Sequence, residues 1–272
     1  MRRTLMICLA SFMTCTAGIA CAVEAMPAVL PQPNVALFGL HEAPVTVADP
    51  YRSSPLKPFE VTYSGYPVVP VLDTLLGHAW RTPGSLVAFE AADGYLSIIP
   101  ADRFLRYPAY LVYGRADGDD FSVELPPLNN RVKLGPWYLV WDNLIYQSLQ
   151  ADGATYWPYQ VMKVGLIDAP SKAKLFPPML PERYRSGAAL TEKYCLACHQ
   201  VNGVGGRKLP IDLGQWAAAQ SFARFATWVL DPSGKNPLTT MPALASERPA
   251  SERQLIARQI YGYLRAVGAL GK

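Results

Sequence analysis

The chain has 272 residues, enough for about two domains at roughly 150 residues each. Half of the residues are hydrophobic and 17% are charged, which excludes a disordered chain and predicts a packed globular protein. The formal net charge is +4, and the basic residues are scattered rather than bunched into runs, so we expect no nucleic-acid partner. The 25 prolines favour turns and linkers over long helices.

The N-terminal stretch has the pattern of an export signal. Arg2 and Arg3 give it a basic start, and no charged residue follows between Thr4 and Val23. Polar residues interrupt the apolar part, which favours a cleaved signal peptide over a permanent membrane span. The sequence therefore predicts a signal peptide over residues 1–25 and a periplasmic mature protein.

The cysteines divide between this leader and the last third of the chain. Cleavage would remove three of the five cysteines and leave only Cys195 and Cys198, so no disulfide framework remains. Gly18–Cys21 is a poor lipidation signal, because glycine stands where a branched apolar residue is preferred. We expect membrane association only if the leader is retained or lipidated.

After the leader, the pattern changes twice. Residues 26–57 are rich in proline and lack clear periodicity, which predicts an extended arm. Residues 58–168 carry short strand-like runs separated by turn residues, and a helix is expected over 69–76, closed by Gly77. The expected strands are 60–63, a hairpin of 86–89 with 95–99, a second pair of 109–113 with 121–125, and the runs 137–141 and 159–164. No repeated β-α-β rhythm appears, so we predict a β-rich α+β domain with a mixed or mainly antiparallel sheet.

Part of this β-rich region is similar to a known fold, in the runs Gly65–Leu72, Phe89–Tyr95, Leu111–Tyr113 and Leu134–Trp137. These runs resemble the molybdopterin-binding domain of the sulfite oxidase type. Members that bind molybdenum supply a cysteine thiolate to the metal, and no cysteine lies between Cys21 and Cys195. Because that ligand is absent, molybdopterin is not expected, and the resemblance implies a scaffold for docking or for binding a small ligand.

The motif Cys195-Leu196-Ala197-Cys198-His199 is a C-x-x-C-H. In an exported protein this pattern is typical of c-type haem attachment, in which both thiols bond the haem and the histidine binds its iron. A thioredoxin-like redox pair does not need the trailing histidine. A zinc site would need two more ligands, and no cysteine or histidine follows His199. The sequence predicts one covalent haem c, held by Cys195 and Cys198, with His199 as an axial iron ligand.

The region around this motif, residues 182–272, resembles class I cytochromes c. A proline-rich linker is expected over 169–181 and a helix over 182–195, leading into the haem motif. A second helix is expected over 255–267. Between the two, residues 215–230 have a helix-like pattern, and their aromatic side chains would keep water from the haem.

The same resemblance implies contacts around the haem. Gly187 of the first helix would meet Tyr261 or Tyr263 of the second, and the carbonyl of Pro210 would orient the imidazole of His199. Three basic residues near the motif would either steer an acidic partner or be ordinary solvated charges: Lys193, Arg207 and Lys208.

Met241 is the predicted second axial ligand of the iron. It is the only methionine after His199, and it lies in a loop with prolines at 237 and 242. Class I cytochromes c place their axial methionine in such a loop. The alternative is a methionine that fills a gap in the core. His/Met ligation raises the reduction potential, which suits a one-electron carrier.

Together these patterns predict a multidomain chain, with a β-rich α+β, sulfite-oxidase-like domain followed by an all-α cytochrome c domain over 182–272. The predicted function is that of a periplasmic monohaem cytochrome that carries single electrons between a dehydrogenase and a downstream acceptor, and no catalytic residues are assigned. One alternative is a molybdopterin-dependent oxidoreductase of the sulfite dehydrogenase type, or a subunit of one. Another is a haem-based ligand-binding sensor.

Overall fold

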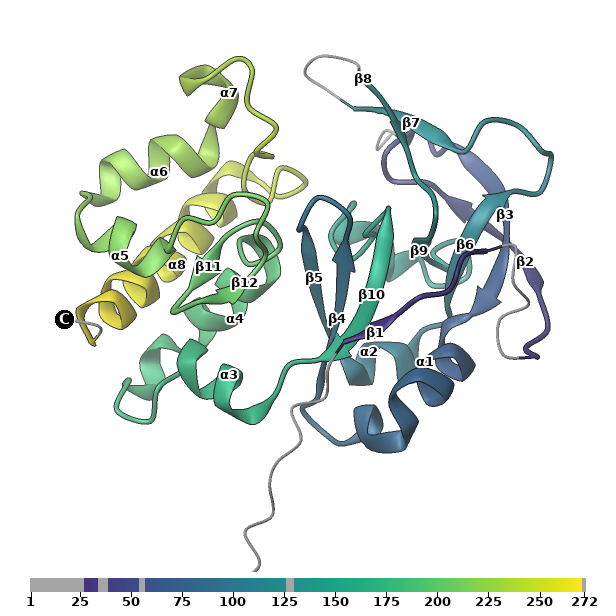
Figure 1. The fold of residues 1–272 in the computed structure, drawn as a ribbon. Helices are drawn as coiled ribbons and strands as arrows, with labels where there is room; N and C mark the ends of the chain where they lie inside the picture. The colour runs from purple at the N-terminus through teal and green to yellow at the C-terminus, as the bar shows by residue number, and fades with distance from the viewer. Residues whose placement is uncertain (1–26, 34–38, 54–56, 126–129, 271–272) are drawn as a thin grey trace, which may run out of the picture.

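A computed structural model describes residues 27–33, 39–53, 57–125 and 130–270 (Figure 1). The predicted signal peptide lies outside these ranges. Within them, no helix combines the length and the apolar character needed to cross a membrane.

Two four-stranded antiparallel sheets dominate the β-rich half, drawn from purple to teal in Figure 1. The first has the order β1 (Ala28–Val29), β10 (Val161–Leu166), β4 (Leu86–Ala91) and β5 (Leu96–Pro100). The second has the order β2 (Ala43–Ala48), β3 (Glu60–Pro67), β6 (Ala109–Arg115) and β9 (Tyr138–Trp141). A hairpin of β7 (Ser122–Leu125) and β8 (Asn130–Lys133) stands apart. The short helices of this half are α1 (Val68–Leu76), η1 (Gly77–Arg81), α2 (Ala101–Arg106) and η2 (Gln147–Asp152).

The core of this half contains side chains from both sheets and from α1 and α2. In β2, Val45 and Val47 are buried while Thr46 between them is exposed, as expected for a strand with one face on a core. Strand β9 is buried along its whole length, with Trp141 fully enclosed. Burial of each such side chain contributes about 1.5–3 kcal/mol.

Elements with strong local signals are confirmed. These are the strand over 60–63, the helix over 69–76, the hairpin of 86–89 with 95–99, and the strands at 137–141 and 159–164 within two residues. Helix α1 ends at Gly77, whose φ of +60° favours glycine. The described residues of the expected arm, 27–33, 39–53 and 57, do more than extend along the surface, because they supply β1 and β2 to the two sheets.

The predicted pairing of 109–113 with 121–125 is wrong. Strand β6 lies between β3 and β9, and β7 pairs with β8 instead. Leu111 and Val112 of β6 are both fully buried, so side chains on both faces of this strand are covered. Such a strand takes a central place with partners on both edges, which the neighbouring hairpin could not provide.

The C-terminal half, green to yellow in Figure 1, is grouped around the long helix α8 (Ala250–Leu270). Helices α4 (Arg185–Tyr194), α5 (Leu213–Ala218) and α6 (Phe222–Leu230) pack against it. The remaining elements are α3 (Ala169–Leu175), η3 (Glu182–Tyr184), β11 (Gln200–Val201), β12 (Val204–Gly205) and α7 (Pro232–Lys235). Buried side chains recur every three or four residues along α8, at Ala257, Ile260, Tyr263, Leu264 and Val267, the pattern of a helix with one face on a core.

The two predicted terminal helices of this half are present, and their contact is confirmed. A Cβ built on Gly187 of α4 would stand 2.8 Å from the Cβ of Tyr263 and would clash with the carbonyl oxygen of Gln259. The helices can approach this closely because Gly187 has no side chain. The stretch 215–230 is broken into α5 and α6 at Ser221, whose hydroxyl accepts a hydrogen bond from the backbone N–H of Arg224, a common N-terminal cap.

The stretch 169–181, expected as a linker, contains the short helix α3. Asp168 caps this helix by accepting a hydrogen bond from the backbone N–H of Ser171 at 2.8 Å, as N-cap aspartates commonly do. Leu175 at the end of α3 is buried in the same hydrophobic cluster as Tyr263. This segment is therefore packed against the C-terminal half over part of its length.

The predicted fold class is wrong. The sequence favoured a sulfite-oxidase-like β-rich domain followed by a separate all-α cytochrome c domain, whereas the described residues form a β-rich α+β fold with several sheets and interspersed helices. The β11–β12 hairpin lies within the C-terminal half. Ile98 of β5 is buried in one cluster with Leu196 and Ile260. Because this core needs a strand residue from the other half, the C-terminal helices are not a distinct all-α domain.

Candidate haem attachment site

The C-x-x-C-H motif directly follows α4 and continues its turn. The backbone N–H of Cys195 donates to the carbonyl of Thr191 at 2.9 Å, and the N–H of His199 donates to the carbonyl of Cys195 at 3.1 Å. Cys195 and Cys198 are both free thiols and both half-buried. The motif therefore presents two reduced cysteines and a histidine on a compact, hydrogen-bonded turn.

The chemistry of the two thiols differs from that of a redox-active pair. Burial raises the pKa of the Cys195 thiol to about 12, and burial also raises the pKa of Cys198. A thioredoxin-like cysteine has a lowered pKa, because the thiolate is its reactive form. This environment does not favour the thioredoxin-like alternative.

His199 is 9% exposed and held by one hydrogen bond. Its Nδ1 lies 3.1 Å from the carbonyl oxygen of Leu209. A carbonyl can only accept, so Nδ1 carries the proton and Nε2 keeps its lone pair. Burial lowers the pKa of His199, although the Leu209 hydrogen bond opposes this shift. The result is a neutral imidazole with a free Nε2, the form in which histidine binds metals.

The carbonyl that orients His199 belongs to Leu209, so the expectation that Pro210 supplies it is wrong by one residue. The N–H of Leu209 donates to the carbonyl of Cys198 at 2.9 Å, which fixes Leu209 opposite the motif. Proline has no N–H and could not make this anchoring bond.

Two glycines bring the following loop close to the motif. A Cβ on Gly205 would clash with the carbonyl oxygen of His199, and a Cβ on Gly206 would clash with that of Ala197. The N–H of Gly206 donates to the carbonyl of Leu196 at 2.7 Å. The glycine-rich loop therefore closes directly on the backbone of the C-x-x-C-H motif.

Met241, the predicted second axial ligand, is half-buried. It packs against the hydrophobic cluster that contains Leu196, the residue after the first motif cysteine. Its backbone N–H donates to the hydroxyl of Thr239 at 3.1 Å, which shapes the loop. Met241 thus lies on the same core as the motif, while its role as an iron ligand stays a prediction. Of the aromatic residues expected near the haem, Phe225 is buried, and Trp216, Phe222 and Trp228 are half-buried.

The basic residues near the motif are paired within the chain, although the Arg207 side chain is still 67% exposed, and their role in steering a partner stays a prediction. Each forms an ion pair with an acidic residue of the β-rich half: Lys193 with Asp152 at 2.6 Å, Arg207 with Glu90 at 2.5 Å, and Lys208 with Asp93 at 2.8 Å. These pairs join residues far apart in the sequence, and no local pattern signals them.

Residues of the β4–β5 hairpin reach the haem motif itself, which the sequence did not indicate. The N–H of Leu96 donates to the carbonyl of Ala197, and the N–H of Arg207 donates to the carbonyl of Gly94, both at 2.8 Å. Burial raises the pKa of Tyr95 well above its usual value, and the nearby Cys198 raises it further. The Asp93-Gly94 dipeptide signalled only a turn, and nothing local showed what this turn touches.

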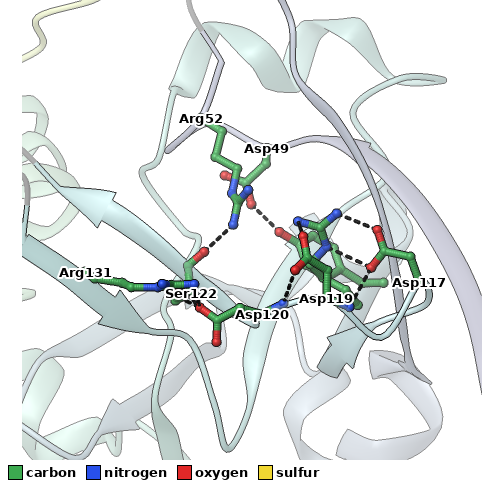
Figure 2. Close-up of polar contacts among 9 residues, drawn as sticks. Asp49, Arg52, Asp117, Asp119, Asp120, Ser122 and Arg131 are labelled. Atoms are coloured by element: carbon green, nitrogen blue, oxygen red, sulfur yellow. Dashed lines mark hydrogen bonds and ion pairs between the residues drawn. The ribbon is translucent and has the colours of Figure 1, made fainter.

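A second polar cluster lies in the β-rich half, around the fully buried Asp49 (Figure 2). Its carboxylate accepts hydrogen bonds from the hydroxyls of Tyr63 at 2.6 Å and Tyr138 at 3.3 Å, and from the N–H of Tyr51 at 2.8 Å. Burial raises the pKa of Asp49, against the lowering effect of these bonds. Arg52 lies beside it and donates to the carbonyl of Ser122. We interpret this cluster as a structural tie between strands, because its acceptors are occupied by the chain itself.

The aspartates of the neighbouring acidic turn are paired with arginines (Figure 2). Arg115 pairs with Asp117 and with Asp119, and Arg131 pairs with Asp120. Within the described ranges, no group of three or more His, Cys, Asp or Glu side chains is arranged to hold a bare metal ion.

Comparison with known proteins gives no relative. No family model matches the chain, and none of the curated proteins matches it. A function can therefore be assigned only from the site itself: two free thiols, a neutral imidazole with a fixed tautomer, and a glycine loop that closes on them.

Proposed function

We propose that the protein is a periplasmic monohaem c-type cytochrome that carries single electrons between a dehydrogenase and a downstream acceptor protein. The observation that carries this proposal is the state of His199. Its Nδ1 donates to the carbonyl of Leu209 at 3.1 Å, so Nε2 is left for a metal. It stands directly after two free thiols at the C-x-x-C spacing.

The residues present fit a covalently bound haem. Cys195 and Cys198 would hold it through thioether bonds, His199 would bind its iron, and Met241 is the candidate second axial ligand. Bound there, haem c supplies one-electron redox chemistry, and its potential depends on the axial ligands and on burial. The protein contributes attachment, orientation and the exclusion of water.

The apolar surroundings support this role. Leu196, within the motif, is 1% exposed, and Phe225 and Tyr263 of the same cluster are equally buried. A hydrophobic shell around a metal site limits solvent access and helps to set its potential. In this proposal the β-rich half serves as a docking element. Three of its acidic side chains pair with basic residues around the motif, which ties this half to the C-terminal half.

The proposal is tested by expressing the full chain in a host that matures c-type cytochromes. We expect haem that remains bound after denaturation, iron at one per chain, and the weak methionine-to-iron charge-transfer band in the oxidised spectrum. Replacing both Cys195 and Cys198 by alanine should leave no covalent haem. A colourless wild-type protein would contradict the proposal.

Met241→Ala tests the second ligand. We expect the charge-transfer band to disappear and the reduction potential to fall, because a thioether ligand raises the potential of haem iron. Met162→Ala is the matched control, since this methionine lies on β10 in the β-rich half, and it should leave the band unchanged. An unaltered spectrum in Met241→Ala would contradict His/Met ligation.

The same preparation separates the alternatives. Stoichiometric molybdenum would indicate a molybdopterin-dependent oxidoreductase. Ready binding of carbon monoxide to the reduced haem, at an axial position that Met241 does not occupy, would indicate a ligand sensor.

A further inference from the structure

The turn of the β4–β5 hairpin holds Arg207 and Lys208, the two residues that follow Gly205 and Gly206. The carbonyl of Gly94 accepts a hydrogen bond from the N–H of Arg207 at 2.8 Å. The carboxylate of Asp93 pairs with Lys208 Nζ at 2.8 Å. A Cβ on Gly94 would lie 3.2 Å from the backbone of both Arg207 and Lys208. The turn and the segment therefore meet backbone to backbone, with an ion pair beside them.

The next residue, Leu209, is the one that holds His199. Its N–H donates to the carbonyl of Cys198 at 2.9 Å, and its carbonyl accepts from His199 Nδ1 at 3.1 Å. The hairpin contacts fix the two residues immediately before it. A continuous series of contacts thus runs from Asp93 and Gly94 to the imidazole of His199.

The Asp93–Lys208 pair is suited to a positional role. Burial alone would lower the pKa of Lys208, but its bond to Asp93 outweighs this effect and raises it. Burial alone would raise the pKa of Asp93, but the hydrogen bonds from Lys208 and from the N–H of Tyr95 outweigh burial, so the pKa of Asp93 is lowered. Both groups are therefore charged near neutral pH. The side chain of Asp93 is 39% exposed and that of Lys208 is 30% exposed. Ion pairs this exposed add little to overall stability.

We propose that the β4–β5 hairpin turn is a positioning element for His199. Asp93 and Gly94 fix Lys208 and Arg207, these fix the carbonyl of Leu209, and that carbonyl keeps the imidazole in its Nδ1–H form with Nε2 directed to the haem iron. The inference rests on the proposed haem function. A firm hydrogen bond at Nδ1 makes the imidazole a more basic ligand, which favours ferric over ferrous iron.

Lys208→Met is the most informative variant, because two explanations predict opposite signs. If Lys208 acted only through its charge, losing a cation near the haem would favour the ferric state. If it positions Leu209, its loss weakens the His199 hydrogen bond and favours the ferrous state. At a fixed ambient potential we expect the ferrous-to-ferric ratio of the holoprotein to rise about tenfold, a factor taken from the low end of the effects that loss of an outer-shell partner has on metal affinity or activity. For a one-electron couple this corresponds to about 59 mV.

Asp93→Asn should raise the ferrous-to-ferric ratio by a similar factor. The double variant Asp93→Asn/Lys208→Met should resemble either single variant, because all three variants break the same Asp93–Lys208 ion pair. Lys208→Arg keeps the charge and should restore the wild-type ratio. Lys193→Met is the matched control. It breaks an ion pair of the same kind with Asp152, outside the segment that leads to Leu209, and should shift the ratio toward ferric.

A second readout is independent of the potential. NMR can follow the exchange of the His199 Nδ1 proton with solvent in the ferrous holoprotein. This exchange should be at least about tenfold faster in Asp93→Asn than in wild type. A tenfold faster exchange corresponds to about 1.4 kcal/mol of lost protection. Asp152→Asn should leave this exchange unchanged. Equal exchange rates in wild type and Asp93→Asn, or a ferric shift in Lys208→Met, would overturn the positioning role. A wild-type protein without haem would instead contradict the proposed function.

Discussion

The two halves of the molecule have cores of different kinds. In the β-rich half the largest rings are enclosed by one another, and four tryptophans are at most 2% exposed: Trp80, Trp137, Trp141 and Trp157. Its buried carboxylate, Asp49, is surrounded by donors of the same half. This core is filled by its own side chains.

The core around the C-x-x-C-H motif is built differently. Its fully buried members are mostly aliphatic, while Trp216, which packs against them, is only half-buried. Its backbone segments approach at glycines, including Gly187 and Gly206. The β-rich half thus has a core enclosed by its own aromatic rings, whereas the core of the C-terminal half leaves rings such as that of Trp216 partly exposed.

The largest expected effect concerns the core of the β-rich half. Trp141 is fully buried, stacks on Phe104 with ring centroids 5.0 Å apart, and donates from Nε1 to the carbonyl of Tyr156 at 2.8 Å. Trp141→Ala should lower the free energy of unfolding by about 3–5 kcal/mol, measured by urea denaturation. The half-buried Trp228 is the control, and Trp228→Ala should cost only about 1 kcal/mol in the haem-free protein. Equal losses would contradict the difference between the halves.

Local signals account for what the sequence predicted correctly. The hairpin of β4 and β5 follows from two short apolar runs on either side of the Asp93-Gly94 turn, and α8 follows from its repeated buried face. In each case the decisive contacts lie within a few residues along the chain.

Long-range pairing accounts for what was missed. Strand β6 pairs with β3 and β9 rather than with the next strand in sequence, and Glu90 pairs with Arg207 across the two halves. Ile98 completes the core of the C-terminal half, which overturned the expected all-α domain. Each of these contacts depends on which distant parts of the chain meet in the fold, and residue spacing along the chain does not predict that.

Glu192 lies where the two halves meet, and a smaller effect is expected there. Burial raises its pKa to about 7 from 4.5, while Lys172 opposes the shift. The negative charge of Glu192 in turn helps to raise the pKa of Tyr156 in the β-rich half and of Tyr263 in α8. The unfolded chain loses this proton at lower pH than the folded one, so the contribution of Glu192 to stability falls as pH rises from 4.5 to about 7.

Glu192→Gln should remove this dependence. We expect the variant to be more stable than wild type by about 2 kcal/mol near pH 8, and the difference to vanish near pH 4. Urea denaturation at a series of pH values measures it. A constant difference across the series would show that Glu192 titrates normally and that water enters the junction.

The last expected effect, similar in size, concerns the glycine contact between α4 and α8, and its control substitution has the smallest effect. Gly187→Ala places a methyl group against the backbone of Gln259 and the Cβ of Tyr263, so the helices must separate, at a cost of about 2 kcal/mol. Gly262 provides the control on the facing helix. A Cβ there would meet only Tyr184, at an ordinary 3.8 Å, and alanine favours a helix interior over glycine by about 0.5–1 kcal/mol. Gly262→Ala should therefore stabilise the protein slightly while Gly187→Ala destabilises it, as measured by thermal and urea unfolding. If both substitutions raised the stability, α4 and α8 would not depend on a missing side chain at their crossing, and the C-terminal core would be looser than its backbone contacts indicate.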